Sequence, residues 1–159
     1  MSIAQQLSTY REYHHDHRNV LTHAVGIPMI VLGITTLLSR PVLDLAGFAI
    51  TPAVVAGVLA SLWYLRLDLR TGLIMTGLLA LFVALGHQIA QFSMAVWLVS
   101  GIGLFVVGWI FQLVGHKFEG RKPAFVDDVR SFLVGPLFVV VEGLFALGLM
   151  KDLQRQVDG

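Results

Sequence analysis

Histidine is the residue type in this sequence with most capacity for chemistry. The chain has 159 residues, six histidines and no cysteine, so a bound metal has to be held by histidine, aspartate or glutamate. Five of the histidines lie in two short segments, namely His14, His15, His17, His23 and His116. The carboxylates Asp16 and Glu119 stand beside these segments. This composition suits a hard or borderline metal such as Fe(II) or Zn(II).

Helix geometry limits how the N-terminal histidines can combine. Eight or nine residues separate His15 and His14 from His23, which is about 12–13.5 Å along a straight helix. Asp16 is a favourable N-cap for a helix that begins at His17, and this helix start would leave the two earlier histidines in a turn that can fold back. Which of His14 and His15 reaches His23 stays open.

Two ionisable groups lie inside apolar stretches, where they are costly and usually functional. His23 is one helical turn inside the first stretch and shares a helix face with Asn19. Glu142 is about halfway along the last stretch, so it must be protonated, paired or in contact with water. We expect function for both. His87, by contrast, is expected to be interfacial or structural, and His17 to be solvated.

The composition excludes an ordinary soluble domain. Hydrophobic residues make up 56% of the chain and charged residues 13%, and the mean hydropathy is +0.77. After a short polar N-terminal segment come five apolar stretches, at Val20–Leu38, Leu45–Leu65, Thr71–Gly86, Met94–Val114 and Phe132–Met150. The third is short for a span. We predict an all-α integral membrane helical bundle of about five transmembrane helices, forming a single domain over residues 1–159.

The charges predict an orientation and exclude one class of partner. Eight of the eleven Lys and Arg residues fall on the side of the N-terminus in a five-span topology, so the positive-inside rule places that side in the cytoplasm. The histidine segments lie on the same side. The formal net charge of +1, without a basic cluster, argues against a nucleic-acid partner. A bacterial inner membrane is the favoured location, or the endoplasmic reticulum if the protein is eukaryotic.

Three sequence blocks resemble a known family. Tyr13-His14-His15, followed by Asn19 and His23, resembles an H-x4-N-x3-H signature. The run from Trp109 to His116, continued by Phe118 to Ala124, is similar to the pattern W-x-x-Q-x-x-G-H…F-E-x-R-x-P-A. Gly135-Pro136-Leu137-Phe138, followed by Glu142, matches the closing block. On these blocks the chain is identified as a member of the family of fungal 2-hydroxy-fatty-acid dioxygenases, which are small membrane proteins.

The resemblance implies an Fe(II)-dependent dioxygenase of α-oxidation. Its substrates would be a 2-hydroxy fatty acid and dioxygen, and it would remove the carboxyl carbon as carbon dioxide, with the acyl tail held in membrane lipid. The motif histidines would bind the iron as His14, His23 and His116, with His15 as a substitute. Groups near the metal, and therefore catalytic candidates, would be Asn19, Glu119, Arg121 and Glu142, of which Arg121 could hold the substrate carboxylate.

Two other functions stay open. A lipid hydroxylase or desaturase with a histidine cluster would use a different number of metal ions, but six scattered histidines are few for a two-metal site. A non-catalytic lipid-binding or transport bundle would use His23 and Glu142 as a polar path. Transporters usually carry paired half-repeats, which the sequence lacks.

Overall fold

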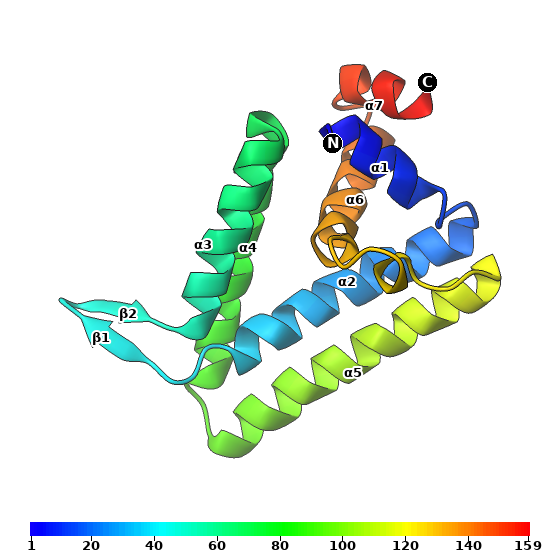
Figure 1. Cartoon of the computed structure of the whole chain (residues 1–159). Helices are drawn as coiled ribbons and strands as arrows, with labels where there is room; N and C mark the ends of the chain where they lie inside the picture. Colours follow the sequence, from blue (N-terminus) through cyan, green and yellow to red (C-terminus); the bar gives the residue numbers. More distant parts are fainter. The chain divides into compact units, whose positions relative to one another are not determined.

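The protein consists almost entirely of helices. The computed structural model describes residues 1–159, except for the side chain of Phe125 (Figure 1). The elements in chain order are α1 (Ile3–Arg11), α2 (His17–Leu37), β1 (Leu43–Leu45), β2 (Phe48–Ile50), α3 (Pro52–Leu67), α4 (Leu69–Ala90), α5 (Met94–Glu119), the 3-10 helix η1 (Ala124–Val126), α6 (Ser131–Ala146) and α7 (Lys151–Asp158). The predicted all-α class is confirmed, with one small antiparallel hairpin, β1–β2, between α2 and α3.

The helices α2, α4 and α5 are long and apolar enough to cross a membrane. The pair α6 and α7, bent by 114°, could add one broken span, and α3 is a shorter apolar helix of 16 residues. Spans of this length and composition indicate a membrane protein. A count of five spans stays a prediction.

The fifth predicted stretch ends early, because α6 ends at Ala146, and the second and third stretches also differ from the helices of the structure. The second was expected to begin at residue 45, but that position lies in β1, and α3 begins at Pro52 after the N-cap Thr51. The turn between the strands uses Ala46 and Gly47, both at positive φ. The hairpin therefore interrupts an apolar run for which the sequence predicts a single helix. The third stretch is not short, because α4 has 22 residues.

The chain forms two compact units, residues 1–27 with 110–159, and residues 28–109. In the first, α1 packs on α6 and α7 through Ile3, Leu7 and Tyr10, which are buried. The N-terminal segment is polar overall, but these three side chains give it one apolar face. Arg11 at the end of α1 forms ion pairs with Glu142 of α6 and with a carboxylate of α7, Asp158.

In residues 28–109, α3 and α4 form a helical hairpin and lie side by side (Figure 1). The C-terminal part of α2 is in close contact with α4. The Thr35 hydroxyl donates to the carbonyl of Phe82 at 3.0 Å, and a Cβ added to Gly86 would lie 2.7 Å from the backbone nitrogen of Thr36. Small residues allow membrane helices to approach in this way, so Gly86 is needed for this contact.

We therefore expect Gly86→Ala to destabilise this unit. The added methyl group would meet backbone atoms of α2, and overpacking of this kind costs about 1–3 kcal/mol. Thermal unfolding of the purified protein in detergent measures the effect. Gly77→Ala is the matched control, because Gly77 is also in α4 and has open space at its Cβ position. Equal unfolding temperatures for the two variants would contradict the close contact.

Candidate metal centre

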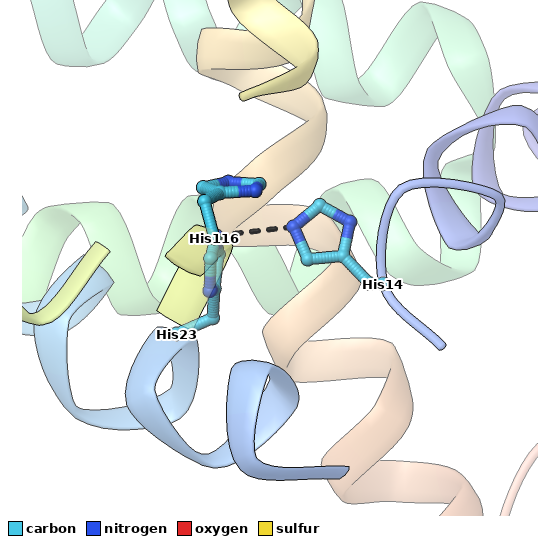
Figure 2. A group of neighbouring side chains, drawn as sticks. All are labelled: His14, His23 and His116. Atoms are coloured by element: carbon cyan, nitrogen blue, oxygen red, sulfur yellow. Dashed lines mark hydrogen bonds between the residues drawn. The ribbon is translucent and has the colours of Figure 1, made fainter. Parts of the chain in front are cut away.

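Three of the predicted metal ligands come together in the structure. His14, from the turn between α1 and α2, lies beside His23 of α2 and His116 of α5 (Figure 2). Their nearest ligand nitrogens all lie within 4.8 Å of one another, and all three residues are buried. The Nε2 atoms of His14 and His23 are 3.0 Å apart. Two nitrogens that bind one ion at about 2.1 Å lie at most about 4.2 Å apart, so this pair meets the limit.

Backbone carbonyls fix the orientation of two of the rings. Nδ1 of His14 lies 2.8 Å from the carbonyl oxygen of Tyr10, and Nδ1 of His23 lies 2.9 Å from that of Asn19. A carbonyl oxygen only accepts, so in both rings Nδ1 donates and Nε2 keeps its lone pair. The two lone pairs then face each other. Nδ1 of His116 is buried without a hydrogen-bond partner among the described residues. A cation bound between these nitrogens would satisfy their lone pairs.

The environment keeps the site in its metal-binding form. Burial lowers the pKa of the His14 imidazole to about 4, so the ring is neutral at pH 7. Neutral imidazole is the form that binds metals, and three such nitrogens without a thiolate suit iron, zinc, copper or nickel. The residues present therefore fit a divalent transition metal.

The turn before α2 brings His14 back to His23. The Asp16 carboxylate accepts from the backbone N–H of Arg18 at 2.9 Å and also binds the Arg18 side chain, so it caps a helix that begins at His17, as predicted. The Tyr10 ring stacks on His14 with the ring centres 4.3 Å apart. These contacts hold the turn in a folded-back conformation.

Glu119 fastens this turn to the end of α5. Its carboxylate accepts from the backbone N–H groups of His15 and Asp16, each at 2.9 Å, and from Nδ2 of Asn19 at 3.0 Å. The Asn19 amide also donates to the carbonyl of Tyr13 at 3.2 Å. Both side chains therefore position the histidines, because the backbone carbonyl of Asn19 itself accepts from Nδ1 of His23.

The other candidate residues lie elsewhere. The His15 side chain is exposed and does not belong to the three-histidine group. Arg121 donates to the carbonyl of Glu12 at 2.6 Å, and Glu142 is in its ion pair with Arg11. His87 belongs to the other unit, where its ring lies 2.6 Å from the amide of Gln91.

Two neighbours of the histidines, Tyr10 and Phe138, are not among the site residues predicted from the sequence. Tyr10 supplies both a stacked ring and a carbonyl to His14, and the Phe138 ring centre lies 5.4 Å from that of His14. The spacing of Ile3, Leu7 and Tyr10, at i, i+4 and i+7, was the available signal for a docked amphipathic helix. No comparable signal points to Phe138, because its position depends on how α6 packs.

A glycine allows α2 and α5 to approach at the site. A Cβ added to Gly115 would lie 2.5 Å from Oδ1 of Asn19 and would also overlap the Thr22 hydroxyl. Gly115 precedes His116, so the helix contact and the third histidine occupy the same turn of α5. The close approach of α2 and α5 therefore explains why a glycine precedes the histidine in this motif.

We expect Gly115→Ala to weaken metal binding by at least about tenfold, because it displaces a residue that orients His23. Titration with Co(II), followed by visible absorption, measures this. The matched control is Gly103→Ala in the same helix, where a Cβ meets nothing within 4 Å. Wild-type affinity in Gly115→Ala would show that the contact is not needed.

The metal-free protein should show a histidine that resists protonation. Burial disfavours the imidazolium of His14, so its ring should titrate near pH 4 instead of near 6.5. Nitrogen-15 NMR of histidine-labelled protein during acidification reports this titration, with His14→Gln used to assign the signal. Protonation of His14 near pH 6.5 would contradict the burial of the site.

Comparisons with known proteins show the family of this chain. The sequence model of the family described as 2-hydroxy-palmitic acid dioxygenase Mpo1-like matches residues 1–147. The chain is 36% identical over 160 residues to the 2-hydroxy-palmitic acid dioxygenase MPO1 of Saccharomyces cerevisiae (strain ATCC 204508 / S288c), covering 99% of this chain and 88% of that protein. No solved structure matches. With nearly the whole sequence matched, the chain belongs to the 2-hydroxy-palmitic acid dioxygenase Mpo1-like family.

Proposed function

We propose that this protein is an iron-dependent dioxygenase that shortens 2-hydroxy fatty acids by one carbon. One molecule of 2-hydroxy acid and one of dioxygen give the acid one carbon shorter, carbon dioxide and water, which balances all atoms. Family membership supports the substrate class. The proposal rests on the buried group of His14, His23 and His116, in which the Nε2 atoms of the first two face each other.

Iron is the metal we assign to this site. Three neutral imidazoles also suit zinc, but zinc has no redox chemistry, and the conversion of a 2-hydroxy acid by dioxygen is an oxidation. A ferrous ion held by His14, His23 and His116 would supply the open coordination positions and the electrons for this chemistry. The carboxylate and the neighbouring 2-hydroxyl of such a substrate would form a chelating pair for this metal.

The protein's own part is to orient and shield the histidines. The carbonyls of Tyr10 and Asn19 hold the Nδ1 protons, which keeps both Nε2 atoms free. Burial keeps water from the rings and keeps the His14 ring neutral. Asn19 and Glu119 act as positioning residues through their contacts with the turn. In this proposal Arg121 and Glu142 have structural roles as well.

The membrane would hold the acyl tail of the substrate. The charge distribution supports an orientation with the N-terminus in the cytoplasm, so that the histidine site faces that side. We propose a bacterial inner membrane as its location, or the endoplasmic reticulum if the protein is eukaryotic.

Metal analysis tests the site. The purified wild-type protein should bind about one iron per chain, while His23→Ala and His116→Ala should lose it, because two imidazoles hold an ion much more weakly than three. His15→Ala is the matched control, since His15 is adjacent to a ligand but exposed, and it should keep its iron. Iron content unchanged in the two ligand variants would contradict the site. Loss of iron in His15→Ala would contradict the choice of His14.

Product analysis tests the reaction. Iron-loaded protein incubated with 2-hydroxypalmitate should consume one dioxygen for each C15 acid and carbon dioxide formed. Removal of the metal with a chelator should stop the reaction, and added Fe(II) should restore it. A protein that binds iron and 2-hydroxypalmitate without forming product would favour the non-catalytic lipid-binding function instead.

A further inference from the structure

An apolar groove runs between α3 and α4, in the unit of residues 28–109. It has a volume of about 460 Å³ and is lined mainly by aliphatic side chains and by small residues, including Val54, Gly57, Val58, Ala80, Val83 and Ala84. Its lining runs from Thr51, the N-cap of α3, to Leu62, and from Thr76 to His87 in α4, which corresponds to about 16 Å along each helix axis. An apolar groove of this length and volume fits a single acyl chain.

Polar and charged side chains lie at one end of the groove, among apolar ones. A second cavity of about 360 Å³ shares Ala49 and His87 with the groove, and Ser39, Arg40 and Gln91 also line it. Ser39, Arg40, His87 and Gln91 lie near the C-terminal ends of α2 and α4, so the polar cavity is at the ends of these helices. The groove, by contrast, runs along the apolar sides of α3 and α4. A molecule that filled both would have a polar head and an apolar tail.

Arg40 gives the polar end a positive charge. Its guanidinium donates to the carbonyls of Ala90 and Phe92 at the end of α4 and lies over the Trp97 ring. Among the described residues it forms no ion pair with a carboxylate. Because carbonyl groups do not neutralise a full charge, this cation would attract an anionic head group.

We propose that the groove and its polar cavity form one binding site for a long-chain fatty acid, with the tail between α3 and α4 and the carboxylate at Arg40 and His87. The volume of the groove, about 460 Å³, favours one acyl chain over the two of a phospholipid. The choice of a fatty acid among anionic amphiphiles rests on the proposed function, whose substrate and product are both fatty acids. The three histidines of the metal centre belong to the other unit and do not line this site.

Photolabelling tests the site directly. The full-length protein in detergent micelles, without added metal, is irradiated with palmitic acid that carries a diazirine in mid-chain, and the labelled peptides are identified by mass spectrometry. Label should concentrate on residues 54–62 and 76–84. Excess palmitate should prevent it, whereas methyl palmitate, which has no charge, and phosphatidylglycerol should compete at least about tenfold more weakly.

Two variants and two matched controls locate the tail and the head group. Ala84→Phe fills the groove and should reduce labelling at least about tenfold, whereas Leu81→Phe, on the same helix but outside the lining, should not. Arg40→Gln should weaken palmitate binding at least about fivefold, and Arg66→Gln, at the other end of α3, should leave it unchanged. Thermal unfolding checks each variant, because Arg40 also binds the end of α4.

Three results would overturn the proposal: equal labelling of all apolar helices, equal competition by methyl palmitate or phosphatidylglycerol, and full labelling of Ala84→Phe. The labelling requires neither iron nor turnover. A protein that is labelled as expected but shortens no 2-hydroxy acid would therefore refute the proposed function alone, and an active enzyme without labelling would refute this site alone.

Discussion

The unit of residues 1–27 and 110–159 is arranged around one contact, in which the Nε2 atoms of His14 and His23 face each other at 3.0 Å with their lone pairs. Both belong to buried rings, and both rings are prevented from turning by a hydrogen bond from Nδ1 to a backbone carbonyl. Two acceptors in this position repel each other unless a cation lies between them, and burial makes protonation of the His14 ring costly. A metal ion satisfies both nitrogens, with His116 as the third ligand.

The rest of this unit holds that arrangement through contacts between segments far apart in the sequence. The Glu119 carboxylate at the end of α5 binds the turn before α2, and Gly115 lets the two helices approach at the level of the histidines. The docked helix α1 supplies the carbonyl of Tyr10, and its ion pairs through Arg11 fasten it to α6 and α7. The metal site thus depends on five helices, although its ligands come from only two short motifs.

The sequence predicted the parts of this site that depend on local rules. Asp16 indicated where α2 begins and that the earlier histidines could fold back, and the structure confirms the helix start at His17 and brings His14, not His15, to His23. Parts that depend on tertiary packing were not predictable in the same way. The pairing of Glu142 with Arg11 needs α1 docked on α6, and the hairpin before Pro52 is hidden in a run that is apolar throughout.

The unit of residues 28–109 has a different chemical character, with an apolar groove and one cation in place of buried histidines. X-ray absorption at the iron edge of the iron-loaded protein tests most directly whether the three histidines bind the metal. We expect outer-shell scattering from three imidazole rings bound to the iron of the wild-type protein. A spectrum with oxygen ligands and no imidazole scattering would contradict it.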